Sequence, residues 1–183
     1  VINSIIDYVS QERKGGAKLF NLPELRFLLL GGEILPSKIV FRWREYFSSK
    51  AHIANLYGST ETIVNATFYL IEPNTHINQN ESIPIGIQKK GSIVRIIDNN
   101  GRLCHPGEIG EICVGGPCLS IGYYNDIKLT EKHFSRLDHS GYSTPFYKTG
   151  DIGKIDRHGM FSYIGRNDSQ IQLHGNRIEL SEI

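Results

Sequence analysis

The stretch that decides the fold is LRFLLLGGE, residues 25–33. Its first part is a mostly apolar run with the length of a buried strand, and Gly31-Gly32 then ends that strand. Upstream, residues 2–9 carry isoleucines and a valine at the spacing of an amphipathic helix. The beginning of the chain therefore predicts a helix, a loop and a buried strand.

A second amphipathic helix is expected to begin at Pro36-Ser37, because proline is favoured in the first turn of a helix. Four apolar residues then share one helical face: Ile39, Val40, Trp43 and Phe47. Residues 53–56 form the next predicted strand. Strands that alternate with helices predict a parallel sheet, and such sheets bind ligands at the carboxyl ends of their strands. Gly31-Gly32-Glu33 and Tyr57-Gly58 both lie at such ends.

After about Pro73 the pattern changes to short strands joined by polar turns. The expected strands cover residues 93–97, 110–114, 146–148, 152–155 and 161–164, with a return strand at 102–104 and a short helix at 129–134. Short strands and tight turns are typical of an antiparallel, hairpin-rich sheet. The predicted fold class is α/β: a parallel-sheet portion with flanking helices, followed by an antiparallel β-barrel-like subdomain.

Composition and charge argue against several classes of function. The chain has 183 residues, a formal net charge of +1 and a pI near 7.9, and its basic residues are scattered. These features argue against a nucleic acid or an anionic membrane as partner. No run approaches the roughly 18 apolar residues of a membrane span, so we predict a cytoplasmic protein. Because the chain begins without Met inside an apolar periodic segment, we expect a piece of a larger protein.

Three polar segments carry most of the functional information: NLYGSTE at residues 55–61, YKTGD at 147–151 and GRNDSQ at 165–170. Each joins glycine, which lets a ligand approach the backbone closely, to aromatic, hydroxyl, carboxylate or guanidinium groups. These are the groups needed to bind the base, sugar, phosphates and metal of a nucleotide. Together the segments predict a nucleotide site.

Each residue also has an ordinary structural explanation. Tyr57 fits a core aromatic residue, and Glu61 fits a carboxylate at a helix start. Asp151 fits a turn former, and Arg166 fits a surface cation. For any one of them alone the structural explanation is preferred. Because residues of the right types occur together in three segments, we predict that they converge on bound nucleotide.

The order of these motifs resembles that of the adenylation domains of nonribosomal peptide synthetases, within the superfamily of acyl-CoA synthetases and luciferases. Residues 55–61 match the family's N-x-Y-G-P-T-E except at Ser59, and residues 147–151 match its Y-[RK]-T-G-D. Further family-like segments are residues 31–33, 85–86, 107–112, 122–123, 165–170 and 175–180. The resemblance implies formation of an acyl-adenylate from a carboxylic acid and ATP, followed by transfer of the acyl group to a thiol.

The resemblance also implies a role for each matched residue. Tyr57 would place its ring on the adenine, Asp151 would hold the ribose diol, and Arg166 would reach the ribose or a phosphate. Thr60 would hydrogen-bond the phosphates, and Glu61 would bind Mg²⁺. The implied catalytic residues are Thr60, Glu61 and Arg166, and the implied nucleotide-contacting residues are Gly31, Gly32, Glu33, Tyr57, Gly58, Thr60, Asp151 and Arg166.

The same resemblance implies a pocket for the side chain of the activated amino acid, lined by Leu28, Leu30, Leu56, Val64 and Asn65. Most of these residues are apolar, which favours a hydrophobic amino acid, and Asn65 would add one hydrogen bond. The alternative is that Leu28 and Leu30 only fill the core of the sheet.

Asp168 would be the hinge between a large subdomain and a small mobile lid. The implied domains are residues 1–72, the C-terminal part of an α/β nucleotide- and substrate-binding subdomain; 73–167, the antiparallel β subdomain; and 168–183, the hinge and the beginning of the lid. ATP and Mg²⁺ would be the cofactors. The implied partner is a peptidyl carrier domain, whose phosphopantetheine thiol receives the acyl group.

Two parts of the family pattern, a phosphate loop ending in Lys-Gly and a late lid lysine, do not occur in this sequence. The chain alone is therefore expected to be inactive. The segment RIEL at residues 177–180 favours the peptide-synthetase branch. Three alternatives stay open: an acyl- or aryl-CoA ligase of the same superfamily, a non-catalytic nucleotide-binding or interaction domain, and last a purely structural β-rich module, which leaves the polar motifs unexplained.

Overall fold

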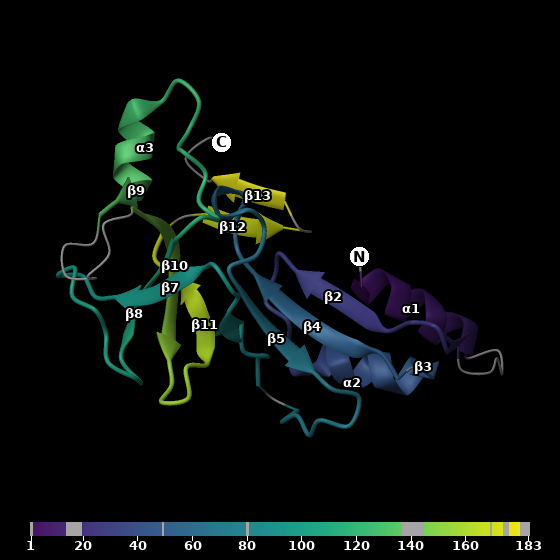
Figure 1. Cartoon of the computed structure of the whole chain (residues 1–183). Coiled ribbons are helices and arrows are strands. Elements are labelled where there is room, and N and C mark those ends of the chain that lie inside the picture. Colours follow the sequence, from purple (N-terminus) through teal and green to yellow (C-terminus); the bar gives the residue numbers. More distant parts are fainter. Residues whose placement is uncertain are drawn as a thin grey trace.

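The computed structural model describes residues 2–13, 20–48, 50–79, 81–136, 145–168, 170–173 and 176–179. These residues form two larger adjoining sheets with flanking helices and two small two-stranded sheets, β1-β3 and β12-β13 (Figure 1). The first half contains α1 (Ile2–Arg13), β1 (Phe20–Asn21), β2 (Phe27–Gly31), α2 (Ser37–Tyr46), β3 (Phe47–Ser48), β4 (His52–Tyr57), the 3-10 helix η1 (Thr60–Thr62), β5 (Thr67–Ile71) and β6 (Ile87–Gln88). The second half contains β7 (Ile93–Ile97), β8 (Ile109–Gly115), α3 (Ile127–His133), β9 (Phe134–Ser135), β10 (Phe146–Ile155), β11 (Phe161–Arg166), β12 (Gln170–Leu173) and β13 (Asn176–Glu179).

The first sheet has the strand order β2-β4-β5-β6. β2 and β4 run parallel, as the alternation of strands and helices predicts. β5 pairs antiparallel with β4, and β6 pairs antiparallel with β5, so the sheet is mixed. The sequence did not predict β5. The chain reverses direction after β4, and hydrophobic periodicity does not report such a reversal. Ile63 and Val64 make this reversal possible with positive φ angles of 50° and 68°.

Helices α1 and α2 pack against one face of the first sheet. The buried residues of their shared cluster are Ile6, Val9, Leu35, Ile39, Val40, Trp43, Phe47, Ile53, Ile71 and Ile83. Phe47 was predicted on the face of the second helix, but α2 ends at Tyr46 and Phe47 begins β3, which pairs with β1. Its ring still stacks on Trp43, with centroids 4.1 Å apart. Within the described ranges, no helix is both long and apolar enough to cross a membrane.

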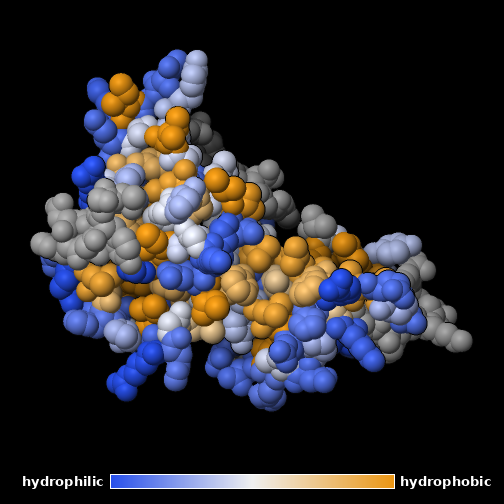
Figure 2. Space-filling view, in the orientation of Figure 1, coloured by the Kyte–Doolittle hydropathy of each residue, from blue (hydrophilic) through white to orange (hydrophobic). Residues whose placement is uncertain are grey.

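The opposite face of this sheet carries exposed apolar side chains. Phe27 and Leu29 of β2 are 47% and 62% exposed, and Leu70 of β5 is 40% exposed. Figure 2 shows hydrophobic residues over these strands. Because successive residues of a strand point to opposite faces, Leu28 and Leu30 point toward the helices and pack against their core cluster.

The second sheet is antiparallel, with the order β11-β10-β8-β7 and with β9 paired to β10. It confirms the predicted change to hairpin-rich structure and, with the first sheet, the predicted fold class. Two expected strands, 146–148 and 152–155, form the single strand β10. The expected return strand at 102–104 is reduced to one isolated bridge between Ile97 and Leu103.

The two sheets meet where Gly86 pairs with Phe161, the first residue of β11. The Phe161 N–H donates to the Gly86 carbonyl at 2.7 Å, and the Gly86 N–H donates back at 3.2 Å. β6 lies after residue 72 yet pairs with β5. The predicted division at residues 72 and 73 stays a prediction, as does the assignment of the β12–β13 hairpin to a lid.

Candidate functional site

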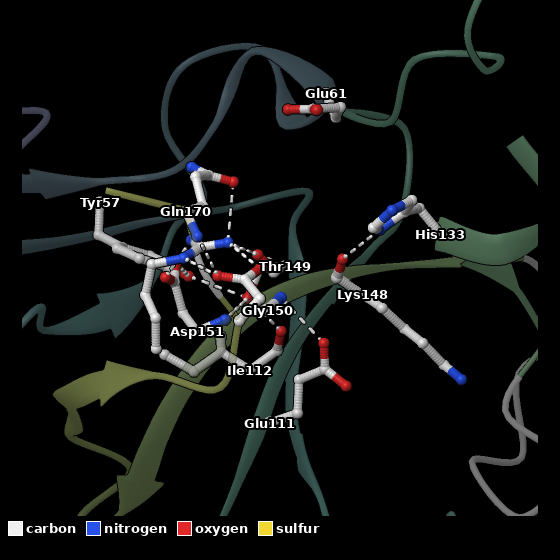
Figure 3. Close-up of polar contacts among 12 residues, drawn as sticks. Tyr57, Glu61, Glu111, Ile112, His133, Lys148, Thr149, Gly150, Asp151 and Gln170 are labelled. Carbon is white, nitrogen blue, oxygen red and sulfur yellow. Dashed lines mark hydrogen bonds and ion pairs between the residues drawn. The ribbon is translucent and has the colours of Figure 1, made fainter. Parts of the chain in front are cut away.

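Three predicted site residues meet at the junction of the two sheets, as Figure 3 shows for Tyr57 and Asp151. Tyr57 ends β4, and Arg166 ends β11 directly opposite Asp151 of β10. The Tyr57 hydroxyl donates to Asp151 Oδ2 at 2.6 Å, and Arg166 Nη1 donates to Asp151 Oδ1 at 2.6 Å. One carboxylate therefore joins all three of the polar sequence segments.

Arg166 forms the centre of this network. Its Nε and Nη2 bind the two carboxylate oxygens of Asp168 at 2.7 and 2.6 Å, and Nη2 also donates to Thr149 O and Gln170 Oε1. The side chains of Arg166 and Asp151 are only 15% and 14% exposed. The planar guanidinium fork is therefore held in one orientation. The predicted hinge role of Asp168 stays a prediction.

An irregularity in β10 presents Asp151 to this network. The pairing of β10 with β8 shifts register across residues 149–151. The Thr149 hydroxyl donates to a backbone carbonyl of β8 at 2.7 Å and accepts the Asp151 N–H at 3.0 Å. The Glu111 carboxylate accepts the N–H of Gly150 at 2.9 Å. Side chains thus replace the ladder hydrogen bonds that the bulge interrupts.

Gly150 is the residue of the T-G-D segment with the strongest backbone requirement. Its φ angle is +75°, and a Cβ atom there would lie 2.4 Å from Asp168 Oδ2 and 2.7 Å from Arg166 Nη2. Only glycine lets both charged side chains pack against the backbone at this point.

Burial controls the protonation of the site. Burial raises the pKa of Asp151 above its ordinary value, although the hydrogen bond from Tyr57 and the charge of Arg166 act in the opposite direction. Burial and the Asp151 charge hold the pKa of Tyr57 well above its ordinary value. The phenol therefore stays protonated and donates a hydrogen bond to Asp151. Folding raises the pKa of Asp151, so the folded state binds this proton more tightly than the unfolded state does. The free energy of unfolding therefore falls as the pH rises from the ordinary to the raised pKa of Asp151. The ionised carboxylate thus lowers the stability of the fold, as is common at functional sites.

Thr60 and Glu61 lie on η1, directly after β4. Thr60 is exposed, whereas Glu61 is 7% exposed and its Oε1 accepts a hydrogen bond from the Tyr123 hydroxyl at 2.7 Å. Figure 3 shows Glu61 apart from the network around Asp151. The structure therefore places Glu61 near the same strand end as Tyr57 but in a separate contact.

The glycines at the ends of β2 and β4 have local structural reasons for lacking a side chain. A Cβ atom at Gly31 would lie 2.8 Å from the Leu56 carbonyl oxygen, and one at Gly58 would lie 2.4 Å from the Val64 carbonyl oxygen. Gly32 has a φ angle of +87°, and both it and Glu33 are exposed. Contact of these residues with a nucleotide stays a prediction.

The five predicted pocket residues occupy different environments. Leu28 and Leu30 pack toward the core of the first sheet, and Leu56 is half-buried. Val64 is 70% exposed, and Asn65 has a buried Oδ1 that accepts no hydrogen bond within the described part of the chain. Their assignment to a substrate pocket stays a prediction.

Sequence reasoning gave no role to Thr149, Glu111, Gln170 or Tyr123. Thr149 and Gln170 stand inside the quoted motifs, and Glu111 and Tyr123 stand inside family-like segments. Membership of a motif was thus the available signal. Their contact partners lie on other elements, so only the tertiary structure gives their roles.

Replacing Thr149 by valine is expected to destabilise the site at nearly constant volume. The Thr149→Val substitution leaves a β8 carbonyl and the Asp151 N–H without their partner, which costs about 1–3 kcal/mol. Thr149→Ser keeps the hydroxyl and should retain most of the stability. Chemical unfolding of both variants measures the difference. Equal stability of the valine and serine variants would contradict this assignment.

The family described as AMP-binding enzyme matches residues 1–124 of the chain. The chain belongs to the AMP-binding enzymes. The matched part includes the first sheet and residues 55–61, whose Tyr57 supplies one side of the network around Asp151.

Curated relatives of this AMP-binding chain include D-alanine--D-alanyl carrier protein ligases. The ligase of Lactiplantibacillus plantarum is 39% identical over 180 residues, which is 98% of this chain and 34% of the relative. The ligase of Bacillus cereus is 40% identical over 162 residues, which is 88% of this chain and 31% of the relative. The chain therefore spans about a third of the length of these relatives.

Solved adenylation domains have the same fold. One is a holo nonribosomal peptide synthetase protein that contains adenylation and PCP domains and is bound to a vinylsulfonamide inhibitor. Its TM-score is 0.81 at 32% identity, and the match covers 98% of this chain and 29% of that protein. Another is the Vibrio cholerae adenylation domain AlmE in complex with glycyl-adenosine-5'-phosphate, with a TM-score of 0.78 at 28% identity. The match covers 98% of this chain and 33% of AlmE. These likenesses confirm the resemblance that the motifs predict.

The residues present fit a magnesium ion that is held mainly by nucleotide phosphates. Among the described residues, no group of three or more His, Cys, Asp or Glu is placed to hold a metal. Glu61 instead offers one nearly buried carboxylate. Mg²⁺ keeps several waters and commonly takes only one or two protein carboxylates when substrate phosphates complete its shell.

Proposed function

We propose that this chain supplies the nucleotide site of a ligase that activates an amino acid as its adenylate and passes it to the thiol of a carrier protein. One observation carries the proposal: in a member of the AMP-binding enzymes, Tyr57 and Arg166 converge on the single carboxylate of Asp151. A purely structural β-rich domain has no need of this arrangement, which costs stability through the buried charge.

Asp151 has the hydrogen-bonding capacity to hold a ribose. Its two oxygens have about four lone-pair sites, and one donor on each oxygen is already supplied by the protein. The remaining sites match the two hydroxyls of a ribose diol. Donation by these hydroxyls favours the charged form of the carboxylate and so offsets part of its burial cost.

In the proposed reaction, a carboxylate oxygen of the amino acid bonds to the α-phosphorus of ATP while the bond from that phosphorus to the pyrophosphate oxygen breaks. Both reactants are anions, so the site must hold them together and stabilise charge on the phosphate oxygens. We assign Arg166 and Thr60 to donate hydrogen bonds to the nucleotide, Tyr57 to face the adenine, and Glu61 to hold Mg²⁺. The ion, when bound, supplies electrostatic stabilisation of the phosphate charge.

The relatives suggest which substrates to test first. Their names specify D-alanine and a D-alanyl carrier protein, and one similar structure holds a glycyl adenylate. The apolar residues of the proposed pocket favour a hydrophobic side chain, so larger apolar amino acids belong in the same panel. A carrier domain with phosphopantetheine is the proposed acceptor. The cytoplasmic location stays a prediction.

The test is amino-acid-dependent ATP–pyrophosphate exchange by the natural full-length polypeptide that carries this chain. We expect exchange with one or a few amino acids from a panel that includes D-alanine, glycine and larger apolar amino acids, and none without amino acid. Exchange with fatty or aromatic acids alone would instead identify a CoA ligase. No exchange across the panel, together with retained ATP binding, would favour a non-catalytic nucleotide-binding domain.

A further inference from the structure

We infer that Tyr123 is a positioning residue that orients Glu61 for the metal ion of the nucleotide complex. The inference rests on the proposed function, because it concerns the magnesium ligand of that site. It assigns a role to Tyr123, which lies in the segment before α3 and binds Glu61 rather than Asp151.

The contact that carries the inference is the hydrogen bond from the Tyr123 hydroxyl to Glu61 Oε1 at 2.7 Å. Glu61 is 7% exposed, so its carboxylate has little water to compensate for a lost donor. The same two segments are joined again through the backbone, since the Ser120 N–H donates to the Glu61 carbonyl at 2.8 Å. Glu61 is therefore held at both its main chain and its side chain by the loop before α3.

Tyr123 is itself held firmly enough to act as an orienting group. Its ring makes edge contacts with His133 and Phe134, with centroids 6.1 and 5.7 Å away at interplanar angles of 79° and 74°. Its backbone N–H donates to Thr130 Oγ1 of α3 at 2.9 Å. At the preceding Gly122, a Cβ atom would lie 2.5 Å from Thr130 Cγ2, so the loop fits closely against the helix.

The chemistry of metal ligands explains what this support does. Ligating carboxylates are commonly hydrogen-bonded by outer groups that fix their orientation, and removal of such a group typically lowers metal affinity 10–100-fold. A donor on Oε1 restricts rotation of the carboxylate and so fixes the direction in which it faces a cation. Helix α3 therefore acts on the metal site through Thr130, Tyr123 and Glu61.

The test is the affinity of the full-length polypeptide for ATP, measured by titration calorimetry in saturating Mg²⁺ and again in EDTA. Tyr123→Phe removes only the hydroxyl and should weaken binding in Mg²⁺ by roughly tenfold. Its affinity in EDTA should equal that of the wild type. Tyr124→Phe is the matched control, because Tyr124 is the next residue and is 93% exposed; it should change neither value.

Each outcome decides the inference. An equal loss in Mg²⁺ and in EDTA would show a general structural role, and no loss in either would show no role, so both overturn it. In a Glu61→Gln background, Tyr123→Phe should cause no further loss in Mg²⁺, because the proposed effect of the hydroxyl on the metal passes through the Glu61 carboxylate. If the wild type does not bind ATP at all, the proposed function itself fails and this inference fails with it.

Discussion

Replacing Arg166 by alanine is expected to lower ATP affinity tenfold to a hundredfold and to destabilise the second sheet. The side chain binds two carboxylates, Asp151 of β10 and Asp168 beyond the end of β11, which would repel each other without the cation between them. A charge-assisted hydrogen bond is worth about 1.5–3 kcal/mol, which corresponds to the expected loss of affinity. Because Asp168 is partly exposed, we expect a stability cost of about 2–3 kcal/mol, below that of a fully buried pair.

Calorimetric titration with ATP and chemical unfolding measure the two effects of Arg166→Ala. Arg157→Ala is the control, because Arg157 is an exposed cation in the turn between the same two strands. Arg166→Lys keeps the charge but loses the planar fork, so it should recover only part of the affinity. Wild-type ATP affinity in the alanine variant would remove the basis for placing nucleotide at Asp151.

Replacing Gly86 by alanine is expected to destabilise the chain by about 4 kcal/mol or more, among the largest effects of a single substitution. A Cβ atom at Gly86 would lie 1.9 Å from the Phe68 carbonyl oxygen and 2.5 Å from the Tyr69 nitrogen, so backbone must move. Gly86 also exchanges hydrogen bonds with Phe161. The displacement would therefore open the junction that brings Tyr57 to β10.

Gly91 provides an unusually close control for this substitution. Gly86 and Gly91 share a φ angle of +92°, but a Cβ atom at Gly91 would meet nothing within 4 Å. Gly91→Ala therefore carries only the left-handed backbone cost of about 1–2 kcal/mol. Thermal and chemical unfolding of both variants separate the clash from the backbone strain. Similar stabilities of the two would show that the junction relaxes without cost.

The sequence predicted the elements well where one physical signal dominated. Helical spacing identified α1 and α2, and apolar runs followed by glycine identified β2 and β4. It failed where long-range pairing decided the outcome. Phe47 has the right spacing for the helical face, but pairing of β3 with β1 ends the helix before it. β5 was missed because nothing local marks the reversal after β4.

The site residues also fall into those that the sequence predicted and those that only long-range contacts decided. The residue types in the three motifs predicted a nucleotide site, and Tyr57, Asp151 and Arg166 do lie together. The sequence did not predict that Glu61 stands apart with Tyr123, or that Thr149 and Glu111 hold the bulge in β10. These contacts join residues that are tens of positions apart, and periodicity carries no information about such pairs.

The sequence by itself determined the kinds of elements, the order of the motifs and the chemical groups available, because these depend on local periodicity and side-chain type. Only the tertiary structure decided which groups share the Asp151 carboxylate and which face of β2 meets the helices. The physical reason is strand register. A shift of one residue moves every side chain of a strand to the other face, and that register is fixed by pairing with distant strands and by the packed core.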